Sequence, residues 1–102
     1  MGISLKKLLN EEELRKLAGY STFERGQNYA ASGRVVSLTE IENQVITAQV
    51  QGSQLYETKF WLKGKILQYS CTCLFAIEGA FCKHCVAVGL VLTESVKSDN
   101  IF

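Results

Sequence analysis

The sequence contains no proline, only one histidine and one tryptophan, and no excess of either charge. The absence of proline and of low-complexity tracts argues against a disordered linker. Eleven basic and ten acidic residues give a formal net charge of +1, so bulk charge does not indicate a nucleic-acid-binding or membrane-surface protein. The 102 residues are 47% hydrophobic and 21% charged, which predicts one globular domain spanning residues 1–102.

Long hydrophobic runs are also missing. The longest apolar stretch, from Val86 to Leu92, is interrupted by Gly89 and is far too short to span a bilayer. Residues 1–7 lack the apolar segment of a signal peptide. We therefore predict a cytoplasmic or nuclear location without membrane contact. Cysteines stay reduced in those compartments, so clustered cysteines favour a metal site there over a disulfide framework.

The first zone, residues 4–33, has helical periodicity. Asn10 precedes Glu13 by three residues, which predicts a capping box at the start of a helix that Gly19 ends. Ser21 and Glu24 repeat that spacing and predict a second helix, which Gly33 ends. The apolar faces predicted for the two helices carry Leu14, Leu17 and Ala18 in the first and Phe23, Gly26 and Ala30 in the second.

The second zone, residues 34–71, changes to a period of two. Ile46, Ala48 and Val50 alternate with polar neighbours, a pattern typical of half-buried strands. Short polar or glycine-containing segments separate the alternating segments and are predicted to form turns. We predict four antiparallel strands, at residues 34–41, 45–51, 55–62 and 66–71.

A third zone combines a cysteine cluster with a helix from about Lys83 to Ser95. The start of that helix is apolar on all faces, which predicts burial on more than one side, under either the amino-terminal helices or a partner. The chain is therefore predicted to have an α+β fold. It comprises N-terminal helices, a small antiparallel β-sheet, and a zinc knuckle that leads into a C-terminal helix, with the zinc site and helix over residues 71–95.

All four cysteines and the only histidine fall within fifteen residues. Zinc prefers four thiolate or imidazole ligands with short spacers inside each pair, so Cys71, Cys73, Cys82 and His84 are the predicted ligands of one zinc ion. Residues two apart project to the same side of a strand, and a helix start stabilises thiolate, so both pairs suit this role. Four protein ligands leave no open coordination position, which indicates a structural site.

The pattern Cys-x-Cys, a short loop and Cys-x-His before an apolar helix resembles the SWIM zinc finger. The resemblance extends upstream to the segments 23–35 and 45–56 and covers roughly residues 23–92. It implies a zinc-binding module that contacts DNA or protein, often attached to helicase-like chromatin-remodelling ATPases or transposases. Cys85 departs from the family pattern, which more often has an aliphatic residue there.

Other interpretations of the cysteines remain open. Two disulfides would need an oxidising compartment and would give His84 no role. A thiol redox centre is suggested by the Cys-x-x-Cys spacing of Cys82 and Cys85, because thiols at helix starts have low pKa values. Cys85 itself is predicted to act as a small buried hydrophobe. The alternative is that Cys85 replaces His84 as a zinc ligand.

A basic edge beside the zinc site is the predicted nucleic-acid contact. Its residues are Lys59, Trp61, Lys63, Lys65 and Lys83. The alternative is that these lysines are solvated strand and turn positions and that Trp61 covers the core. The predicted function is a non-catalytic interaction module for DNA or for chromatin-type or helicase-like partners. The alternative function is protein–protein docking to a larger enzyme without nucleic-acid binding. An enzyme is disfavoured because Glu78 is the only acid near the site in sequence.

Overall fold

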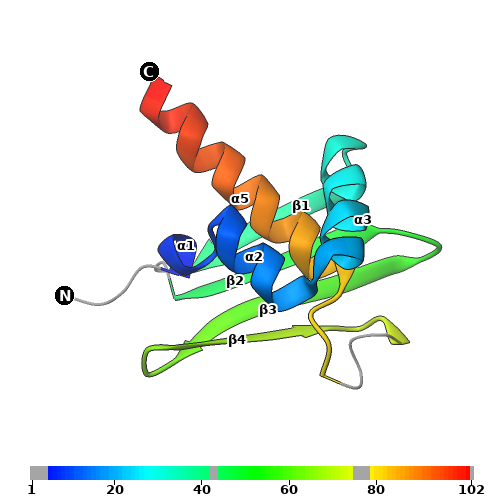
Figure 1. Ribbon diagram of the computed structural model, residues 1–102, viewed down its shortest axis with the longest axis horizontal. Coiled ribbons are helices and arrows are strands. Elements are labelled where there is room, and N and C mark those ends of the chain that lie inside the picture. Colours follow the sequence, from blue (N-terminus) through cyan, green and yellow to red (C-terminus); the bar gives the residue numbers. More distant parts are fainter. Residues whose placement is uncertain (1–4, 42–43, 75–78, 102) are drawn as a thin grey trace.

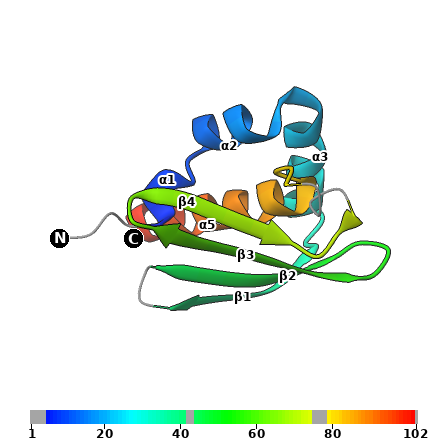
Figure 2. The ribbon, with the colours of Figure 1, turned by 90° about the horizontal axis from the view of Figure 1, so that it is seen from below.

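Helices cover one face of a four-stranded antiparallel sheet in this computed structural model (Figures 1 and 2). The structure describes the backbone of residues 5–41, 44–74 and 79–101, and the side chains of these residues except 6, 7 and 94–101. In chain order the elements are α1 (Leu5–Leu8), α2 (Glu11–Ala18), α3 (Tyr20–Ala31), β1 (Val35–Ile41), β2 (Val45–Gln51), β3 (Leu55–Lys63), β4 (Ile66–Cys71) and α5 (Lys83–Ile101). The predicted α+β fold is confirmed.

Helix α2 begins as the sequence predicts. The side chain of Asn10 accepts a hydrogen bond of 3.0 Å from the backbone N–H of Glu13, and Gly19 caps the other end. Leu14 is fully buried, whereas Leu17, on the same predicted apolar face, is 39% exposed. Leu14 is the buried side chain through which α2 packs against the rest of the chain. The short helix α1 was not predicted as a separate element.

The predicted capping box at Ser21 is wrong, because α3 already begins at Tyr20. Gly19, with φ 84°, serves as the C-cap of α2 and the N-cap of α3, and no side chain caps α3. The chain therefore changes direction within one residue and leaves Ser21 in the first helical turn. At the other end Gly33 adopts φ 70°, and the N–H of Arg34 donates to the carbonyl of Tyr29, as in a Schellman motif.

The sheet has the order β1-β2-β3-β4, and the four strands agree with the predicted ranges to within one residue. The cross-strand pairs Ala48–Thr58 and Thr58–Cys71 lie on the face that the helices cover. The pairs Val45–Trp61 and Thr47–Lys59 lie on the opposite face. Figure 2 shows that no described helix covers this opposite face, which we call the open face.

Helix α5 lies between the sheet and the helices α2 and α3 (Figure 1). Every residue from His84 to Gly89 is buried, so the prediction of burial on more than one side is confirmed, and the amino-terminal helices provide the cover. The helix extends to Ile101 instead of ending at Ser95. Within the described residues, the structure contains no helix that is long and apolar enough to cross a membrane.

Candidate metal centre

The structure brings the four predicted zinc ligands together. Cys71 is the last residue of β4, Cys73 lies two residues further on, Cys82 precedes α5, and His84 is in its first turn. All four side chains are buried, and their ligand atoms lie within 4.8 Å of one another. Segments that are separate in the sequence thus present three sulfurs and one imidazole to a single point.

Two sulfur–nitrogen distances match those around a tetrahedral zinc ion. The Nδ1 atom of His84 lies 3.7 Å from the sulfur of Cys71 and 3.6 Å from the sulfur of Cys82. A tetrahedron with Zn–S bonds of about 2.3 Å and Zn–N bonds of about 2.0–2.1 Å has sulfur–nitrogen edges of about 3.6 Å. The cluster fits one zinc ion. Its four protein ligands would occupy all four coordination positions and leave none for a substrate or a water.

Aromatic rings fix the orientation of the His84 imidazole. The ring of Tyr56 packs on it at a centroid distance of 4.5 Å, and the edge of Tyr29 approaches at 5.4 Å. Nδ1 faces the sulfurs, whereas Nε2 is buried without a hydrogen-bond partner among the described residues. The ring therefore offers Nδ1 as the zinc ligand, and its proton belongs on Nε2.

Thr58 supports the centre from the adjacent strand. Its buried hydroxyl donates a hydrogen bond of 3.4 Å to the sulfur of Cys71. Such donors orient a ligand and stabilise its thiolate form. The alternation that predicts the strand at residues 55–62 assigns Thr58 no role at the metal site. The available signal was a polar residue at a core position between Tyr56 and Phe60, because a buried hydroxyl needs a partner.

Without metal, two thiols of the centre resist ionisation. A hydrogen bond that the Cys71 thiol donates to Cys82, and then burial, raise the pKa of Cys71 to about 11. For Cys82, the hydrogen bond with Cys71 lowers the pKa, but the hydrogen bond with Cys85 and burial outweigh it and raise the value to about 12. Both residues are therefore neutral thiols at pH 7, and the binding of zinc must displace their protons.

Zinc affinity should consequently rise steeply with pH. The zinc-bound form carries at least two fewer protons than the metal-free form, so each increase of one pH unit below pH 8 should raise the apparent affinity by at least about 100-fold. Acidification should reverse the effect and release the ion. Competition with a chromophoric chelator between pH 6 and 8 measures the slope. An affinity that does not change with pH would contradict displacement of thiol protons.

Cys85 lies beside the centre but outside the group of four. It is fully buried in the hydrophobic core, and its sulfur is 3.7 Å from that of Cys82. This placement agrees with its predicted role as a small buried hydrophobe. None of the four cysteines forms a disulfide.

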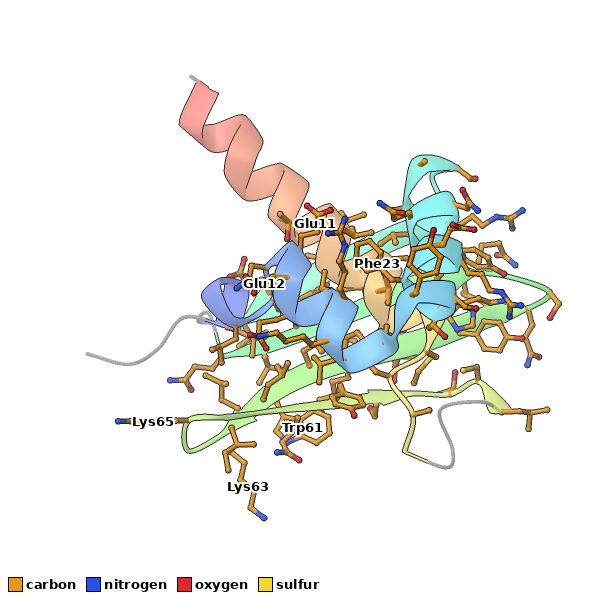
Figure 3. All side chains as sticks on the ribbon, in the orientation of Figure 1. Glu11, Glu12, Phe23, Trp61, Lys63 and Lys65 are labelled. Atoms are coloured by element: carbon orange, nitrogen blue, oxygen red, sulfur yellow. The ribbon has the colours of Figure 1, made fainter. Side chains whose placement is uncertain are left out.

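The structure groups most, but not all, of the residues predicted to contact nucleic acid. Lys59 and Trp61 lie on the open face, with the Lys59 ammonium 5.5 Å from the indole centroid. Lys63 ends β3 and Lys65 lies in the turn to β4, and Figure 3 shows the Lys63 side chain extending away from the helices and the Lys65 side chain extending outward beyond the turn. Lys83 lies elsewhere: its ammonium is 4.9 Å from the ring of Tyr29, on the helical side of the sheet. Glu78 falls outside the described residues.

The family model of the SWIM zinc finger matches residues 54–90. The matched segment contains β3, β4, the four clustered ligands and the first turns of α5. Neither the curated proteins nor the solved structures gave a match. The family match and the geometry of the cluster agree on a zinc-binding module with one metal site.

Proposed function

We propose, from the match of residues 54–90 to the SWIM zinc finger model, that this chain is a non-catalytic interaction module whose open face binds DNA weakly and with little base selectivity. Zinc has a structural role in this proposal. Four protein ligands would fill the tetrahedral positions of a zinc ion and would leave none for substrate or for an activated water. The function then depends on the surface that the zinc-stabilised fold presents.

The observation that carries the proposal is the arrangement of cations around one aromatic residue. Lys59 packs beside Trp61 on the open face, Lys63 ends the same strand, and Lys65 lies in the turn that follows. Lysines neutralise phosphates, and an accessible indole face stacks on bases. The chain is nearly neutral overall, so attraction to DNA must come from this local group.

The position of α5 argues against base readout. Recognition helices enter the major groove with polar side chains that contact base edges. The first half of α5 is instead apolar and buried between the sheet and the other helices. Binding through the open face should therefore depend on phosphates and stacking, which discriminate little among sequences.

Reversing the charge of Lys63 and Lys65 to glutamate should reduce DNA binding to below detection at low salt. For the parent protein, three neutralised phosphates predict a log–log salt slope of about −3 with duplex DNA. Fluorescence anisotropy with labelled single- and double-stranded DNA at several salt concentrations measures the loss of binding in the variant and the salt slope of the parent protein. The control is Arg15→Glu with Lys16→Glu, which changes the net charge equally but lies on exposed positions of α2. Equal loss in both variants, or no loss in the first, would count against this surface.

A protein partner is the alternative, and one feature of the open face favours it. Ile41 is 53% exposed and belongs to the cross-strand row of Val45 and Trp61, while Ile66 is 66% exposed on β4. Exposed aliphatic residues beside an indole suit a protein interface. If the parent protein binds no DNA at low salt, docking to a helicase-like ATPase or another larger protein becomes the preferred function.

A further inference from the structure

A pocket of about 300 Å³ opens beside the metal centre on the helical side of the sheet. Thr22, Arg25, Gln54, Tyr56 and Lys83 line it together with residues of the zinc cluster. These residues come from α3, the β2–β3 turn, β3 and the start of α5, which meet at one end of the molecule (Figures 1 and 2). The volume is about ten times the share of one water molecule in the liquid, so the pocket is much larger than an ion site.

The charges around this pocket favour an anion. Arg25 and Lys83 both line it, and no described acidic residue does. Within the described part of the chain, Arg25 makes neither an ion pair nor a hydrogen bond. Lys83 packs on Tyr29 through a cation–π contact, which leaves its N–H groups available as donors. Three thiolates with one zinc ion carry a charge of about −1, and the two cations exceed it.

The neutral groups narrow the class of anion. The hydroxyl of Thr22 and the amide of Gln54 add donors that suit an oxyanion with several terminal oxygens. A guanidinium matches a phosphate with two parallel hydrogen bonds. Tyr56 adds an aromatic wall, and the volume lies at the lower end of the range for small-molecule sites. We propose that this pocket binds a phosphate group, held between Arg25 and Lys83, either as free phosphate or as the phosphate of a mononucleotide.

This site is separate from the proposed DNA surface. Tyr56 and Thr58 share the helical face of β3, whereas Lys59 and Trp61 point to the open face. Loss of DNA binding in the Lys63 and Lys65 variant therefore leaves the phosphate site intact. Failure of the phosphate site likewise leaves the DNA proposal standing.

Titration of the zinc-loaded, isotopically labelled protein tests the site. Separate arms use inorganic phosphate, a 5′-mononucleotide and the corresponding nucleoside, each to about 10 mM, which detects even millimolar affinity. Amide signals of Thr22, Arg25, Gln54 and Lys83 should shift with the first two ligands. Equal affinities identify free phosphate as the ligand, and tighter binding of the nucleotide identifies the monoester. No shift, or equal shifts with the nucleoside, would overturn the proposal.

Substitution then locates the contact. Arg25→Gln and Lys83→Gln should each weaken phosphate binding about tenfold, as expected for one charged hydrogen bond. Lys65→Gln removes the same charge at a distant turn and should leave the affinity unchanged. Zinc content is measured for every variant, so that a damaged metal centre is not mistaken for a lost contact. Unchanged affinity in both pocket variants with full zinc content would overturn the assignment.

Discussion

Cys82→Ser should release zinc and loosen the end of β4 together with the first turns of α5. Structural zinc contributes an apparent ~10–16 kcal/mol in isolated finger peptides at neutral pH, which equals the whole stability of many small domains. Here α5 packs against α2, α3 and the sheet, so those helices should lose their support with it. The ladder of β1, β2 and β3 does not depend on the metal directly and should keep its protection longest.

Amide hydrogen exchange and metal analysis check this prediction. Exchange should accelerate by orders of magnitude at Cys71 and from Cys82 to Leu92, and zinc content should fall well below one ion per chain. The matched control is Cys85→Ala, which removes a buried sulfur beside the centre but none of the four grouped ligands. That variant should keep its zinc and show only a packing defect. Amide exchange in zinc-free Cys82→Ser that is as slow as in the parent protein would show that the ion does not stabilise this region.

Gly26→Ala should destabilise the domain, although the same substitution normally stabilises a helix interior. Alanine is favoured over glycine in a helix by roughly 0.5–1 kcal/mol. A Cβ atom at Gly26, however, would lie 2.3 Å from the Cβ of Val86 and 3.0 Å from the carbonyl oxygen of Lys83. The contact involves the stem of a β-branched side chain and the backbone, so relief requires α3 and α5 to move apart. We expect a net loss of about 1–3 kcal/mol.

Thermal unfolding of zinc-loaded protein measures this effect. A loss of this size corresponds to a melting temperature lower by roughly 4–20 °C for a domain of this length. Gln27→Ala, at the exposed neighbouring position of α3, is the control and should change stability by no more than about 0.5 kcal/mol. An unchanged or raised melting temperature for Gly26→Ala would contradict the close packing of α3 on α5.

Patterns within single segments allowed most of the fold to be predicted. The strand limits follow from period-two alternation interrupted by turns, and those signals are local. The grouping of the four metal ligands was also predictable, because paired spacing at a strand end and a helix start leaves few geometries. The helical extension of α5 to Ile101 was missed because the apolar pattern ends near Leu92.

Features that depend on how elements pack were not predictable. Leu17 has the helical spacing of an apolar-face residue, but it is 39% exposed, whereas Leu14 is fully buried. Lys83 stands beside two ligands in the sequence, yet its side chain turns to Tyr29 and away from the lysines of β3. The phosphate pocket likewise exists only because α3, α5 and the β2–β3 turn meet.

The central claim is that Cys71, Cys73, Cys82 and His84 bind one zinc ion. X-ray absorption at the zinc edge, combined with metal analysis of protein purified without chelator, tests it most directly. The expected result is one zinc per chain, with three sulfurs at about 2.3 Å and one nitrogen at about 2.0–2.1 Å. A first shell without sulfur, or zinc content near zero, would contradict the account.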